Sequence, residues 1–184
     1  MRQRCVYVSP WRIDVTVRDA AAPTTSVPLL CRAIARALTA AGAPEPASIG
    51  LVLSDDAELA DLNRTHMGAD GPTDVLSFPL LPASSYPPHA GRSEAPGAPA
   101  STEFVEPPGR RRHLGDIVVS VERAIEQAAA GRGGQTGDVR WSTRDELRLL
   151  VTHGTLHVCG WDHAEPREEA AMRALEQRLL AEGR

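Results

Sequence analysis

The residues best suited to chemistry are three histidines near the C-terminal end of the chain, His153, His157 and His163. His153 and His157 are four residues apart, so a helix would place both imidazoles on one face, one turn apart. Gly160 suits the left-handed conformation that ends a helix, and the chain can then turn back so that His163 approaches the same point. Three imidazole nitrogens with a fourth position open for water form the ligand set of a catalytic zinc site. The spacing therefore predicts one bound Zn²⁺ ion.

Other interpretations of these histidines remain open. The spacing H-x-x-x-H-x-x-G-x-x-H is the ligand pattern of the metzincin peptidases, in which a glutamate general base follows the first histidine. Here that position is Gly154, so the proton acceptor is unidentified. A structural zinc would need a fourth ligand, and Cys159, which is nearby, is expected to point elsewhere on the helix. The alternatives are a zinc metallopeptidase-like hydrolase with a glutamate supplied from elsewhere, and a non-catalytic zinc-containing assembly factor.

Three blocks of the sequence resemble one known family. The first is the histidine motif itself, His153-Gly-Thr-Leu-His-Val-Cys-Gly-Trp-Asp-His163. The others are the segment from Leu62-Asn-Arg-Thr65 through Pro72-Thr-Asp-Val-Leu-Ser-Phe-Pro79, and Leu114-Gly-Asp-Ile117. In this order the blocks are similar to those of the YbeY family of bacterial metal-dependent endoribonucleases, which are ribosomal RNA maturation factors. The resemblance covers most of the chain outside residues 80–112.

The resemblance implies a function and a set of partners. It implies a zinc-dependent endoribonuclease, specific for single strands, that processes the 3′ end of 16S rRNA and serves ribosome quality control. The implied partners are RNA, above all ribosomal RNA, and the ribosome or its small subunit. Arg64 matches the family's functionally important arginine, which implies that it holds a phosphate and stabilises charge on the phosphate oxygens. From the residues alone, Arg64 would be a surface residue near the end of a helix.

Several polar side chains could support this site. Thr73, Asp74 and Ser77 fall on a segment that lines the cleft in the YbeY family, which implies substrate contacts, although they could equally be edge or turn residues. Asp162 could accept a hydrogen bond from a ligand histidine and fix its tautomer, or could be a plain turn residue. Asp116, in the third block, could orient a ligand histidine or cap neighbouring backbone.

Composition restricts the class of protein. The chain has 184 residues, of which 42% are hydrophobic, as expected for a single globular domain spanning residues 1–184. We find no apolar run long enough to span a bilayer and no apolar signal-peptide stretch, and we expect a cytoplasmic protein. Net charge is −4, so any contact with RNA must be made by a local basic patch. Cys5, Cys31 and Cys159 suggest no disulfide framework, and we expect Cys5 and Cys31 to be buried.

Hydrophobic patterning predicts an α/β (α+β) fold, with a small mixed sheet of about four strands and about five helices. The predicted strands are residues 12–18, 49–53, 73–78 and 114–121. Helices are expected from an N-cap at Ser26 to residue 41, over residues 55–63 and 121–130, from a capping box at Thr143 and Glu146 through the histidine motif, and from Pro166 onward.

One segment departs from this pattern. Seven of the chain's 15 prolines lie between Pro82 and Pro108, mixed with Gly, Ser and Ala. We therefore predict a flexible insertion at residues 80–112 between two core strands. Arg110-Arg-Arg112 at its end is the one dense basic run. It is either a solvated charge run or a patch that faces RNA.

Overall fold

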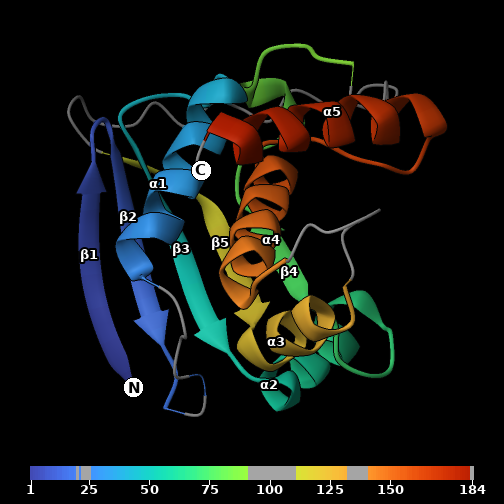
Figure 1. Ribbon diagram of the computed structural model, residues 1–184. Helices are drawn as coiled ribbons and strands as arrows, with labels where there is room; N and C mark the ends of the chain where they lie inside the picture. Colours follow the sequence, from blue (N-terminus) through green and yellow to red (C-terminus); the bar gives the residue numbers. More distant parts are fainter. Residues whose placement is uncertain (20, 22–25, 91–110, 132–140, 183–184) are drawn as a thin grey trace.

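The computed structural model describes residues 1–19, 21, 26–90, 111–131 and 141–182. A five-stranded sheet in the order β1-β2-β3-β5-β4 carries all of its long helices on or around one face (Figure 1). Strands β2, β3 and β5 are parallel, and the outer strands β1 and β4 are antiparallel to their neighbours. The strands are β1 Arg2–Val8, β2 Trp11–Val17, β3 Ala47–Ser54, β4 Val75–Pro79 and β5 Arg112–Ser120.

The predicted mixed sheet with five α-helices is confirmed for the described residues. The helices are α1 Val27–Ala40, α2 Asp56–Leu62, α3 Val121–Ala129, α4 Thr143–Val158 and α5 Pro166–Glu182, with a π-helical turn η1 Asn63–Met67 and a 3₁₀ turn η2 Ala83–Ser85. None of the helices in the described ranges is long and apolar enough to cross a membrane.

Strand β1 was not predicted. It is an edge strand that pairs only with β2, and most of its residues are exposed on both faces. A strand without a buried face has no reason to alternate apolar and polar residues, so the sequence Arg-Gln-Arg-Cys-Val-Tyr-Val shows no period of two. Cys5 lies in this strand and is exposed, so the prediction that it is buried was wrong. The prediction for Cys31, which lies on the buried face of α1, is confirmed.

The core lies between the sheet and helices α1 and α4 (Figure 1). Strand β2 alternates as predicted, with Ile13 and Val15 fully buried against α1. From α1, Leu30, Ile34 and Leu38 meet them at helical spacing, each with no exposed surface.

Helix α4 lies unusually close to the sheet at Gly154. A Cβ at this position would stand 2.8 Å from Ile117 Cγ2 on β5 and 3.1 Å from Val75 Cγ2 on β4. Ser77 Oγ also donates to the Gly154 carbonyl at 3.1 Å. The helix is therefore fixed against β4 and β5 at the level of the histidine motif.

The capping box of α4 is one residue earlier than predicted. Ser142 is the N-cap, and its hydroxyl accepts from the backbone N–H of Asp145, whose carboxylate accepts from the Ser142 backbone. Glu146, predicted for this role, is instead buried and accepts from Trp141 Nε1. Both serine and threonine can cap, so sequence alone does not fix which of two adjacent residues ends the extended chain.

The first part of the segment at residues 80–112 packs against the rest of the fold, and the flexibility of the segment stays a prediction. Tyr86 is 3% exposed and packs beside Gly160, and Pro87 packs against Gly42. The His89 ring stacks on Trp161, with centroids 3.9 Å apart. The Pro-rich composition of the segment gave no indication that Tyr86 and His89 would pack against the fold. Residues 91–110, Arg110 included, lie outside the described residues.

The other two arginines of the basic run are described. Arg111 Nη1 donates to the Pro10 carbonyl at 2.6 Å, and its guanidinium lies 5.7 Å from the centroid of the Tyr7 ring. Arg112 is exposed and begins β5.

Candidate metal centre

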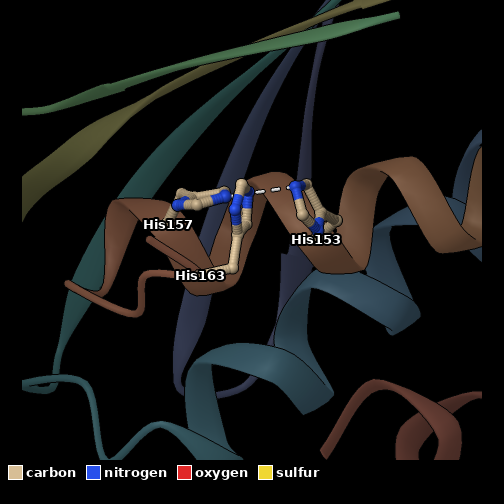
Figure 2. A group of neighbouring side chains, drawn as sticks. All are labelled: His153, His157 and His163. Atoms are coloured by element: carbon tan, nitrogen blue, oxygen red, sulfur yellow. Dashed lines mark hydrogen bonds between the residues drawn. The ribbon is translucent and has the colours of Figure 1, made fainter. Parts of the chain in front are cut away.

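The three predicted histidines meet at one point. Figure 2 shows His153 and His157 projecting from adjacent turns of α4 and His163 reaching back from the loop beyond the helix. Their candidate ligand nitrogens all lie within 4.8 Å of one another. His153 Nε2 and His157 Nε2 are 3.1 Å apart, so both rings present the same nitrogen to the shared space. Three imidazoles converging in this way fit a divalent transition metal such as zinc.

Gly160 turns the chain back as expected. Its φ of 79° is left-handed, and the backbone N–H groups of Gly160 and Trp161 donate to the carbonyls of His157 and Leu156 at 3.0 Å. Cys159, just before it, is fully buried, and burial raises the pKa of its thiol to about 12. Its thiol is therefore protonated at neutral pH and lies outside the histidine cluster.

The loop that carries His163 is held from both sides. The Asp162 carboxylate accepts from the backbone N–H of His163 at 2.7 Å. Trp161 lies under the stacked His89 ring, and Ala83 packs against Gly160. The described residues 83–89 of the Pro-rich segment thus brace the turn that positions the third histidine.

A carboxylate that the sequence did not single out contacts the first histidine. Glu176 Oε1, on α5, lies 2.7 Å from His153 Nδ1, and the Glu176 side chain is 12% exposed. A carboxylate on the second nitrogen of a ligand histidine fixes the ring and directs the other nitrogen to the metal. A clue was present in the sequence, because Glu176 falls beside Leu175 and Leu179 in the stripe of α5 that is buried.

Burial sets the protonation state of the central histidine. The pKa of His157 is lowered to about 4, first by burial and then by the neighbouring His153 and His163. At neutral pH the ring is therefore uncharged and keeps a lone pair for a ligand bond.

The histidines line a cleft of about 1320 Å³ between α4, α5 and β4. Thr73, Asp74 and Ser77 line the same cleft, so the structure brings these three predicted substrate contacts to the site. The Asp74 side chain accepts from Gln127 Nε2 at 3.0 Å and from the backbone N–H of Val75 at 2.9 Å, which holds it in place.

The structure does not bring Arg64 to the cleft. Its side chain is 65% exposed in η1 and forms a 2.7 Å ion pair with Asp61. Met67, three residues later in the same turn, does line the cleft, so η1 borders the site while the guanidinium points elsewhere.

Asp116 lies on the far face of the sheet. Its neighbour Ile117 contacts Gly154 of α4, and adjacent residues of a strand point to opposite faces. The Asp116 carboxylate lies over Gly50 and bonds His113 Nε2 at 3.2 Å. Among the described residues, Glu176 rather than Asp116 or Asp162 bonds the ring of a cluster histidine.

Comparison with known proteins identifies the family of the chain. Residues 15–184 match the family model described as Endoribonuclease YbeY. A Roseiflexus castenholzii protein of that name is 36% identical over 91% of this chain and 90% of its own length. A protein of the same name from Salinispora tropica is 43% identical over 83% of this chain and 85% of its own length. A solution structure of a Thermotoga maritima protein shares the fold, with a TM-score of 0.53, 20% identity and coverage of 93% of this chain and 88% of that one. The chain belongs to the Endoribonuclease YbeY family, whose members are hydrolases that act on RNA.

Proposed function

We propose that this protein is a zinc-dependent, single-strand-specific endoribonuclease that acts on ribosomal RNA. Processing of the 3′ end of 16S rRNA and ribosome quality control are the proposed roles, in the cytoplasm, with the ribosome or its small subunit as partner. We also propose that residues 1–184 form a single domain. The observation that carries the proposal is the convergence of His153, His157 and His163 on the wall of a large cleft in a chain of this family.

The residues around the cluster suit a bound cation. Glu176 holds the His153 ring through Nδ1, so its Nε2 is free to face the Nε2 of His157. The other carboxylates that line the cleft, Asp74, Glu146 and Glu169, add negative charge near the histidines. A zinc ion held by the three rings would supply Lewis-acid polarisation of a phosphoryl oxygen and of water.

The position of Gly154 counts against a peptidase mechanism of the metzincin type. A side chain at residue 154 would enter the sheet, where Ile117, Val75 and Ser77 already fill the space. The packing thus leaves no room for a glutamate general base at residue 154, and the family match favours RNA over a peptide as substrate.

We assign Arg64 the role of holding the scissile phosphate, and Thr73, Asp74 and Ser77 the role of contacting the substrate. Arg64 must leave Asp61 for this purpose. Both side chains of that pair are well exposed, at 65% and 71%, and an exposed pair contributes about 1 kcal/mol or less. An RNA phosphate, which offers a guanidinium two parallel hydrogen bonds, can therefore displace the Asp61 carboxylate.

The proposal is tested by cleavage of a labelled single-stranded RNA, with the same RNA in a duplex as control. Wild type, His157→Ala and Arg64→Ala are compared after their folding and metal content have been measured. We expect wild type to cut the single strand and to stop when chelator is added. We expect His157→Ala to lose metal and activity, and Arg64→Ala to keep metal but cut poorly.

Equal cleavage by all three proteins would identify the activity as a contaminant. A wild type that binds zinc and RNA but never cuts would favour the non-catalytic assembly factor. To test the ribosomal role, small subunits carrying unprocessed 16S rRNA replace the labelled strand, and cutting only of the free strand would contradict it.

A further inference from the structure

We call the cleft lined by His153, His157 and His163 the metal cleft. A second hollow, of about 520 Å³, lies on the other side of α5 from it. Its walls come from α1, the last turns of α5 and the turn that joins β1 to β2. Three arginines line it, Arg32 and Arg36 from α1 and Arg178 from α5, against one carboxylate, that of Glu182. We call this hollow the arginine groove. It is basic although the whole chain carries a net charge of −4.

The arginines of the groove differ from most others in the described structure. Six described arginines elsewhere form ion pairs, namely Arg12, Arg18, Arg64, Arg123, Arg148 and Arg173. Arg32, Arg36 and Arg178 have neither an ion pair nor a side-chain hydrogen bond with any residue in the described ranges. Like charges gathered without partners repel one another and do not stabilise the fold. The groove is therefore a set of guanidinium groups whose donors face solvent.

A fourth arginine, Arg4 on β1, does not line the groove but lies on the same side of the sheet. Arg4 pairs with Val15 in the β1–β2 register, so it lies on the face of the sheet that α1 covers. Burial raises the pKa of the Cys31 thiol to about 11, and the positive charges of Arg4 and Arg32 oppose this rise, so both guanidinium groups lie in the neighbourhood of Cys31 on α1. Arg4 is exposed and, like the groove arginines, has no ion-pair partner in the described chain.

The floor of the groove is fixed by the fold. Trp11 Nε1 donates to Thr39 Oγ1 at 3.1 Å, and the Thr39 hydroxyl donates to the Ala35 carbonyl at 2.9 Å. Arg32 and Arg36 are four residues apart on α1, so they stand side by side on one face above this floor. A planar guanidinium offers two parallel N–H groups that match the oxygens of a phosphate. Successive phosphates of a nucleic acid strand match such a row.

One helix separates the groove from the metal cleft. On α5, Glu176 and Leu180 face the cleft, whereas Arg178 and Glu182 face the groove. Figure 1 shows α5 crossing the ends of α1 and α4, with its C-terminal end beside α1. The two hollows are therefore about one helix diameter apart, roughly 10–12 Å. A strand with one phosphate beside the histidines can cross the end of α5 and continue into the groove.

We propose that the arginine groove binds the phosphate backbone of single-stranded RNA that flanks the cleavage site. This inference rests on the proposed function, since it takes the occupant of the metal cleft to be RNA. It gives an acidic protein the local basic patch that a polyanion requires. Recognition through phosphates alone carries no sequence information, so the groove contributes affinity and register rather than base specificity.

The test is equilibrium binding of a fluorescent single-stranded RNA over a range of salt concentrations. The full-length protein is used as purified and again with chelator, which prevents metal-dependent cleavage of the probe. The variant Arg32→Gln/Arg36→Gln removes two groove charges, and Arg32→Lys/Arg36→Lys keeps both. The control Arg144→Gln/Arg167→Gln removes two exposed arginines outside the groove. Thermal melts verify that each variant is folded.

Loss of two phosphate contacts should lower the slope of log K against log salt by about 1.4, at about 0.7 per contact on a single strand. By the same relation, binding at about 0.1 M salt should weaken roughly 25-fold. The lysine variant and the control pair should keep the wild-type slope.

An unchanged slope in Arg32→Gln/Arg36→Gln overturns the inference, and so does an equal loss in the control pair. Binding of polyglutamate in preference to RNA would also overturn it, and would identify an acidic protein segment as the occupant. These results are separate from the proposed function. A wild type that never cuts RNA but shows the predicted slopes contradicts the nuclease and leaves the groove standing. A wild type that cuts RNA while the slopes stay equal contradicts the groove alone.

Discussion

The contact between Glu176 and His153 gives the sharpest test of how the candidate metal centre is built. Glu176→Ala would remove the acceptor that lies 2.7 Å from His153 Nδ1 and leave all three histidines in place. The ring would then be held only by packing, and the proton could reside on either nitrogen. Because the nitrogen that faces His157 must be unprotonated to bind a metal, we expect weaker zinc binding without loss of the fold.

The structure indicates the size of the effect. Losing the outer partner of a ligand histidine costs roughly 10–100-fold in metal affinity, about 1.4–2.7 kcal/mol. The carboxylate is only 12% exposed, so water cannot easily take its place, and we expect Glu176→Ala near the upper end of that range. Glu176→Gln keeps an oxygen that can accept from Nδ1–H but loses the charge. We expect it near the lower end, at about tenfold.

The assay is competition for zinc against a chelating dye at neutral pH, together with the melting temperature with and without zinc. Glu169→Gln is the matched control, because this carboxylate lies on the same helix and lines the same cleft but pairs with Arg173. The control should bind zinc nearly as tightly as wild type. Wild-type affinity in Glu176→Ala would refute the orienting role. Equal losses in Glu176→Gln and Glu169→Gln would show that only the summed charge of the cleft matters.

Three further predictions follow from the packing and protonation of the site. Gly154→Ala should destabilise the protein by about 1 kcal/mol in denaturant titration, because over-packing of about 1–3 kcal/mol exceeds the helix-propensity gain of about 1 kcal/mol. The metal-free protein should lose stability as the pH falls from 6.5 toward 4: with the folded-state pKa of His157 at about 4, the unfolded chain binds more protons in this range. Thermal melts of metal-free His157→Gln should not show this part of the loss of stability between pH 6.5 and 4. Tyr86→Ala should cost about 3 kcal/mol in denaturant titration, as for other buried aromatics, because Tyr86 is 3% exposed beside Gly160. If the segment at 80–112 were fully flexible, Tyr86→Ala would leave the free energy of unfolding unchanged.

Features set by neighbours in sequence were predictable. The spacing of His153 and His157 fixes their positions on α4, and Gly160 fixes the turn that returns His163. The alternation of β2 likewise gave both its strand character and its buried face. Each depends on local geometry, with a period of 3.6 or 2 residues, and such geometry is fully present in the sequence.

Features set by residues far apart in the sequence were not predictable. Glu176 lies 23 residues after His153, and only the packing of α5 on α4 brings their side chains together. The face on which Asp116 lies depends on the register of β5, which shifts between Ser48 and Gly50 on the paired strand β3. Whether the guanidinium of Arg64 points to the cleft or to Asp61 depends on the π-helical turn η1. Sequence patterns do not predict such a turn.

The distribution of charge explains how one acidic chain could serve both a cation and a polyanion. Carboxylates gather around the histidines, where they favour a bound metal and, without it, repel a phosphate. Arginines that have no ion pair within the described ranges gather across α5, where they attract phosphate whether or not a metal is present. Separation by one helix keeps the two sets from neutralising each other, as they would if Arg178 and Glu176 faced the same hollow. RNA held first at the arginine groove would then enter the cleft favourably only when the metal offsets the carboxylates, so that cleavage is confined to the loaded protein.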